Sequence, residues 1–158
     1  MAQTNREVVI DKLAGTVAND LGGRATVDGL FTVGHTERIT NTAANGAIAV
    51  TKFWSNPHPF PVVATFYLNC DAAVVGNATN FASHLITIDD GANTAPVAAA
   101  SFTTAATNYA ADIDAVATTS NTANCVVAAG ANVFYEVTQA AAGVALPVRV
   151  LKMRARRK

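Results

Sequence analysis

The sequence is poor in cysteine and has no long apolar run, and each scarcity excludes a class of protein. Cys70 and Cys125 are the only cysteines in 158 residues, and they are too few for a disulfide framework. We interpret both as buried free thiols, with a bridge between them as the alternative. No run of 18 apolar residues and no charged-then-apolar leader is present. We therefore expect neither membrane insertion nor export, and synthesis in the cytoplasm.

Motifs of catalysis and metal binding are also missing. The sequence has no GxSxG, P-loop, GxGxxG or HExxH. His35, His58 and His84 are far apart and lack the spacing of a zinc site. Asp89-Asp90 and Asp112-x-Asp114 lack the 12-residue calcium loop, so we interpret them as turn caps. We expect no enzyme activity, no metal and no cofactor. A small glycan hydrolase stays as a minor alternative, because eleven acidic residues always permit a carboxylate pair.

Large side chains are scarce as well, with 11 aromatic residues against 33 alanines. Alanine favours helices, but here it is interspersed with Thr, Asn, Val and Gly, without leucine stripes at helical spacing. The composition therefore favours strands. Because small side chains make a thin core, we expect modest stability and support from neighbouring subunits.

The clearest strand pattern lies in residues 130–153. Val133, Tyr135 and Val137 alternate with polar or outward positions, which is the period of a half-buried strand. The small residues 140–143 can form a turn, and residues 144–153 then form a closing strand that pairs back into a sheet.

Further strands are expected along the middle of the chain. Asn45-Gly46 predicts a hairpin between residues 37–40 and 47–54. The proline-rich residues 55–61 form a loop, because proline cannot sit in an inner strand. The remaining strands are expected at residues 62–68, 83–88, 97–103, 109–116 and 124–128. Together they predict an all-β fold, an antiparallel β-sandwich or jelly roll.

The two ends of the chain differ from this domain. Residues 1–35 are punctuated by glycine and are interpreted as an N-terminal extended arm, followed by the β-sandwich domain at 36–153 and a basic C-terminal tail at 154–158. Residues 1–148 hold 5 basic against 11 acidic residues, whereas residues 149–158 hold 6 basic residues and no acid. A basic end of this kind can bind nucleic acid, an anionic surface or an acidic protein neighbour, or it is merely a solvated, partly disordered end.

The candidate partner-binding residues follow from that asymmetry. In an extended chain Lys152, Arg154 and Arg156 would point to one side, with Met153 and Ala155 on the other. The full set is Lys152, Arg154, Arg156, Arg157 and Lys158. The end lacks interleaved aromatics for stacking bases, which disfavours direct nucleic-acid binding. We expect deletion of residues 152–158 to weaken attachment to a partner and to leave the fold intact.

Aromatic residues around the proline loop suggest an alternative function. Trp54, Phe60 and Tyr67 could form a flat platform for a sugar ring in a carbohydrate- or receptor-binding module. Such residues more often close the end of a thin core, which is the preferred interpretation.

The order of segments in this chain resembles that of a family of small phage proteins. The segments are residues 47–50 and 57–68, an Ala/Thr-rich middle section, and residues 128–139 followed by a strand that ends in arginine. These are the jelly-roll decoration, or cement, proteins of tailed bacteriophage heads. The resemblance covers about residues 45–153. It rests on the order of the segments and on their residue composition, without a diagnostic motif. It implies a homotrimer on the capsid exterior, where major capsid protein subunits meet, and no catalytic residues.

Overall fold

The computed structural model describes residues 32–89, 96–117, 119–121 and 123–158. These residues form ten strands and no helix. The strands are β1 (Thr32–Ile39), β2 (Ile48–Ser55), β3 (Val62–Cys70), β4 (Phe81–Asp89), β5 (Val97–Thr103), β6 (Ala115–Val116), β7 (Thr119–Ser120), β8 (Val126–Val127), β9 (Asn132–Ala140) and β10 (Arg149–Arg157).

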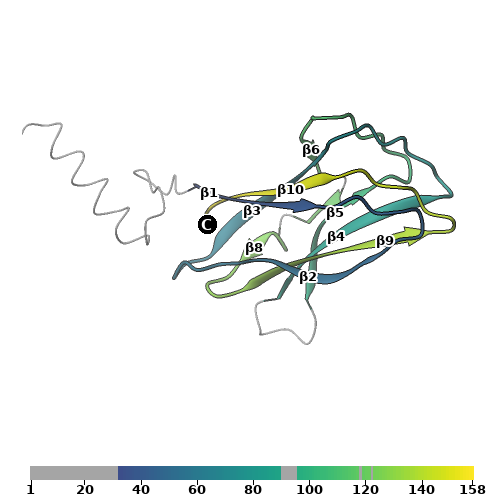
Figure 1. The fold of residues 1–158 in the computed structure, drawn as a ribbon. Coiled ribbons are helices and arrows are strands. Elements are labelled where there is room, and N and C mark those ends of the chain that lie inside the picture. The colour runs from purple at the N-terminus through teal and green to yellow at the C-terminus, as the bar shows by residue number, and fades with distance from the viewer. Residues whose placement is uncertain (1–31, 90–95, 118, 122) are drawn as a thin grey trace, which may run out of the picture.

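The strands form two antiparallel sheets packed as a sandwich (Figure 1). One sheet has the order β1-β10-β3-β6, with β8 also paired to β3, and the other has the order β2-β9-β4-β5-β7. Successive strands alternate between the sheets except at β4 and β5, which pair with each other. This winding is that of a jelly roll. The predicted all-β sandwich is therefore confirmed.

The period-two pattern decides which side chains enter the core. Val133, Tyr135 and Val137 of β9 are buried, as predicted, and Leu151 and Met153 of β10 face them from the other sheet. Full burial of side chains of this size contributes about 1.5–3 kcal/mol each. Alanines fill much of the remaining interior, so the core is thin. Both cysteines are buried free thiols, as expected.

Two predicted pairings are wrong. Asn45 adopts a positive φ of 66° and a turn forms there, closed by a bond from the Gly46 amide to the Ala43 carbonyl. However, the strands on either side, β1 and β2, enter different sheets. The closing strand β10 likewise leaves the sheet of β9 and pairs with β1 and β3. Both turns cross between sheets, because each strand finds a better partner far along the chain.

The boundaries of the elements also differ from the expected ones. β1 begins at Thr32, inside the segment interpreted as an arm; the rest of that segment, residues 1–31, lies outside the described residues. β10 continues to Arg157, so most of the expected tail at 154–158 is part of a strand. The expected strand at 109–116 is reduced to the two residues of β6 and isolated bridges at Tyr109 and Ala111.

Candidate interaction face

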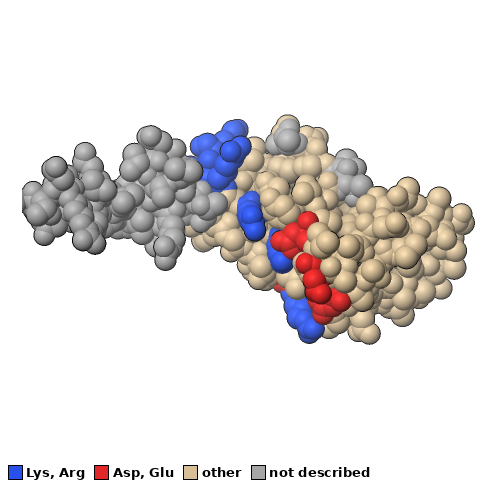
Figure 2. All heavy atoms as spheres, turned by 90° about the horizontal axis from the view of Figure 1, so that it is seen from above, with Lys and Arg blue, Asp and Glu red and all other residues tan. Residues whose placement is uncertain are grey.

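The outer face of the β1-β10-β3 sheet carries the basic residues identified in the sequence. Lys152, Arg154 and Arg156 alternate along β10 with the buried Met153 and Ala155, so they project from one face, as predicted. Seen from above, the molecule shows its charged side chains gathered in a band, with mostly uncharged surface beside it (Figure 2). Since β10 lies between β1 and β3, these cations stand on an inner strand of the sheet.

Lys152 is neutralised within the molecule. Its Nζ lies 2.5 Å from Oδ1 of Asp114, in the segment before β6, and Asn69 Nδ2 donates to the same oxygen at 2.9 Å. The hydrogen bond from Lys152, followed by that from Asn69, lowers the pKa of the Asp114 carboxyl. Arg38 on β1 is paired in a similar way with Asp71, at 3.5 Å. Exposed pairs of this kind contribute little stability, but they reduce the charge left for a partner.

Arg154 and Arg156 are not neutralised in this way. The ion pairs among the described residues are those of Lys152 and Arg38, so neither arginine has a described carboxylate within 4.0 Å. The Arg154 guanidinium lies over the Tyr67 ring of β3, 5.3 Å from its centroid. A stacked guanidinium keeps its N–H groups at the edge, where they can bind a carboxylate in a bidentate way. Arg154 also acts on the Asp114 carboxylate through its charge, but it forms no ion pair with it. This end of the face therefore keeps more positive charge available to a partner than Lys152 does.

The proline loop, residues 56–61, supports the end of β10. The buried Asn56 side chain donates to the carbonyls of Phe60, Val127 and Ala128 at 3.0, 3.1 and 3.0 Å, which ties the loop to β8 and the segment after it. The Arg157 guanidinium lies 4.4 Å from the centroid of the Phe60 ring, and the Lys158 amide donates to the Pro61 carbonyl at 3.1 Å. The last residues are thus held in place, which preorganises the cations beside them.

The three aromatics proposed as a sugar platform do not share a surface. Tyr67 is on the outer face of the first sheet, beneath Arg154. Phe60 is buried in the proline loop, stacked on His58 at 5.3 Å. Trp54 belongs to β2 of the other sheet, where it is partly buried and packs against the core. They lie apart, and two of the three pack inward, as core-closing residues do.

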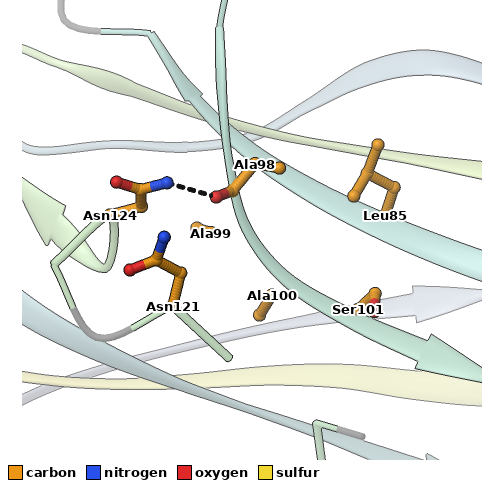
Figure 3. Close-up of a pocket in the computed structure, with 7 residues that line it drawn as sticks. All are labelled: Leu85, Ala98, Ala99, Ala100, Ser101, Asn121 and Asn124. Atoms are coloured by element: carbon orange, nitrogen blue, oxygen red, sulfur yellow. Dashed lines mark hydrogen bonds between the residues drawn. The ribbon is translucent and has the colours of Figure 1, made fainter. Parts of the chain in front are cut away.

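A shallow hollow of about 250 Å³ lies over β4 and β5 of the second sheet (Figure 3). Leu85 and residues 98–101 line it, together with Asn121 and Asn124 from the segment that follows β7 beside β5. Asn124 is committed to the fold, since its Nδ2 donates to the Ala98 carbonyl at 2.8 Å. The lining has no charged group, so the hollow contrasts with the β10 face, although Glu136 of β9 is paired with Leu85 on the same side of the sheet.

One polar pair, buried between the two sheets, was not predicted from the sequence. Arg149, fully buried on β10, donates from Nε to Nε2 of His84 on β4 at 2.6 Å. The signal was present in the alternation: Arg149 is in phase with Leu151 and Met153, and His84 with Ile86. Asp114 and Tyr67 were missed as neighbours of the cations for a different reason, because only the folded sheet brings them there.

Within residues 32–89, 96–117, 119–121 and 123–158, no three His, Cys, Asp or Glu side chains gather closely enough to hold a metal ion. No helix in that part of the chain has the length and apolarity needed to cross a bilayer.

Comparison with known proteins identifies no family for this chain. No protein-family model matches the chain, and no curated protein sequence does. Among solved structures, the chain is similar to a chain in the structure of infectious bursal disease virus Gx strain, with 9% sequence identity and a TM-score of 0.33. The match covers 77% of this chain and 32% of the viral chain, so this chain spans about a third of it. The likeness is compatible with a β-rich fold and supports no argument about function, and the resemblance to phage decoration proteins remains a prediction.

Proposed function

We propose that this chain is a structural virion protein that binds the outer surface of a phage capsid and stabilises the shell, that is, a decoration or cement protein. The observation that carries the proposal is the β10 face, where Arg154, over the Tyr67 ring, and Arg156 project from an inner strand with no described carboxylate within 4.0 Å. Arginine and tyrosine are the residue types that dominate binding energy at protein interfaces. The partner is an acidic surface of the major capsid protein.

The arrangement suits binding without chemistry. A strand between two others cannot rearrange when a partner arrives, so little ordering entropy is lost on the protein's side. Copies bound side by side on a shell gain further through effective concentration. We propose that copies associate as a homotrimer through the hollow over β4 and β5, whose lining has no charged group, since interface cores are depleted of charge. Assembly would follow synthesis in the host cytoplasm.

The direct test is co-sedimentation with capsids assembled from the co-encoded major capsid protein. Arg154→Glu should weaken attachment by about tenfold or more, because it places like charge against an acidic partner. Lys52→Glu is the matched control, with the same charge change on β2, at the edge of the other sheet away from the hollow over β4 and β5, and should attach normally. Lys152→Ala should have a small effect, because Asp114 already neutralises Lys152.

The same co-sedimentation experiment can be repeated at increasing ionic strength. Attachment of the unmodified protein should weaken as ionic strength rises, since exposed charges are screened over about 8–10 Å at physiological salt. Equal attachment of Arg154→Glu and the unmodified protein, or equal loss in Arg154→Glu and Lys52→Glu, would rule out the β10 face as the capsid contact. The alternative function, a carbohydrate- or receptor-binding module, has no support from Trp54, Phe60 and Tyr67, because these side chains lie apart.

A further inference from the structure

The buried His84–Arg149 pair joins the two sheets at one end of the sandwich. His84 on β4 is 1% exposed and Arg149 on β10 is 0% exposed. The Arg149 Nε donates to the His84 Nε2 at 2.6 Å, so that ring nitrogen must be unprotonated. The pair is therefore intact only while His84 is neutral.

The two Nη groups of Arg149 hydrogen-bond to the two chain connections at this end of the sandwich. Arg149 Nη1 donates to the carbonyls of Thr40 and Pro147, both at 3.1 Å, and Nη2 donates to Thr42 Oγ1 at 3.1 Å. Thr40 and Thr42 belong to the β1–β2 connection, residues 40–47, and Pro147 to the β9–β10 connection, residues 141–148. The two connections also bond to each other, through Thr42 and Leu146 at 2.9 and 2.8 Å. They meet at the end of the sandwich away from the C-terminus (Figure 1).

A protonated His84 would place a second positive charge beside Arg149, and no ion pair among the described residues would compensate it. No carboxylate of the described residues lies within 4.0 Å of Arg149. The ionisable groups that face the pair are Cys70 on β3 and Tyr135 on β9, both acting on Arg149, and Glu37 on β1, which accepts from the Tyr135 hydroxyl at 3.2 Å.

Burial lowers the pKa values of both His84 and Arg149. Burial, and then the charge of Arg149, lowers the pKa of His84 to about 3, against a smaller opposing effect of the Phe102 backbone. Burial also lowers the pKa of Arg149, to about 10. β5 contributes no ionisable side chain to this arrangement among its described residues.

We propose that His84 and Arg149 form an acid-operated latch: a proton on His84 Nε2 removes the acceptor of the Arg149 Nε–H, expels the guanidinium, and releases connections 40–47 and 141–148 while the rest of the sandwich stays folded. The direction follows from linkage. A histidine whose pKa is lower in the closed state than in the open one takes up a proton on opening, so acid favours opening. One proton taken up makes opening about tenfold easier per pH unit below about 6.5, the ordinary histidine pKa.

The test is amide hydrogen exchange of the full chain, followed by NMR between pH 7.5 and pH 4. After correction for the intrinsic exchange rate, protection of the Thr42 and Leu146 amides should fall about tenfold per pH unit below about 6.5. The amides of Asn56 and Ala64, which bond to carbonyls elsewhere in the sandwich, should keep their protection. Equal loss at all four amides would mean global acid unfolding and would overturn the latch, as would unchanged protection at Thr42 and Leu146.

A pair of variants isolates the responsible histidine. His84→Gln keeps an acceptor for Arg149 but cannot titrate, so Thr42 and Leu146 should lose their pH response. His58→Gln removes the other buried histidine, at the proline loop, and should leave that response unchanged. A response that survives in His84→Gln, or disappears in His58→Gln, would overturn the assignment. If His84→Gln fails to fold, the comparison of the four amides in the unmodified protein still decides.

Discussion

Arg149 is a cation held in the core by neutral acceptors. Its guanidinium donates to two backbone carbonyls, a threonine hydroxyl and the His84 ring, with no described carboxylate within 4.0 Å. Burying a charge without a counter-ion is costly, and only dense hydrogen bonding offsets that cost. The residue therefore fixes the geometry of the loops around it more than it adds net stability.

We expect Arg149→Met to lower the free energy of unfolding by about 2–4 kcal/mol, because methionine fills the space but leaves buried acceptors unsatisfied. Urea unfolding at pH 7.5 measures the change. Arg156→Met is the control on the same strand; its side chain is exposed, so its effect should stay within about 0.5 kcal/mol. A neutral or stabilising Arg149→Met would mean that dehydrating the guanidinium costs more than its hydrogen bonds return.

At the scale of elements, β10 is the strand on which the first sheet depends. It pairs with β1 along eight registered positions, from Thr32 opposite Arg156 to Ile39 opposite Arg149. On its other edge it pairs with β3, from Cys70 to Val62. Leu151, Met153 and Ala155 also supply part of the core. The expectation that residues 152–158 could be removed without loss of the fold is therefore revised.

We expect deletion of residues 152–158 to abolish cooperative folding, because it separates β1 from β3 and exposes the core. Far-UV circular dichroism and the dispersion of the amide NMR spectrum measure the outcome. Deletion of Lys158 alone, which follows the strand, is the control and should leave both unchanged. A cooperative unfolding transition in the longer deletion would contradict the central place of β10.

At the scale of the whole molecule, the β10 face and the hollow over β4 and β5 differ in charge. The β10 face carries a band of cations and carboxylates, whereas the hollow over β4 and β5 is lined by Leu85, residues 98–101 and two asparagines. One face is suited to an acidic partner and the other to contact between like subunits.

We expect light scattering during size-exclusion chromatography to give a mass of about three times 16.3 kDa, as the proposed homotrimer requires. Ala98→Arg adds a charge at the exposed rim of the hollow and should give a monomer with an unchanged fold. Val75→Arg is the control, since Val75 is exposed on a loop outside this face. A monomeric unmodified protein would remove the trimer from the proposal, and the β10 face would then be tested as the binding surface of a single copy.

The candidate site was predictable in part. Alternation along a strand places Lys152, Arg154 and Arg156 on one side, and it does so whichever strands flank them. Which of these cations remains available to a partner was not predictable, because Asp114 and Tyr67 come from distant parts of the chain. A sequence count treats the three cations as equal, whereas the folded sheet neutralises the first and exposes the other two.

The sequence by itself determined the all-β class, the inward phase of β9 and β10 and the loop at the prolines, because these depend on local period and on backbone geometry. Only the tertiary structure decided which strands pair. Alternation at Asn45-Gly46 and at residues 140–143 is the same whether the next strand stays in its sheet or crosses to the other. The choice rests on contacts across the whole chain, and those contacts also placed Arg149 against His84 in the core.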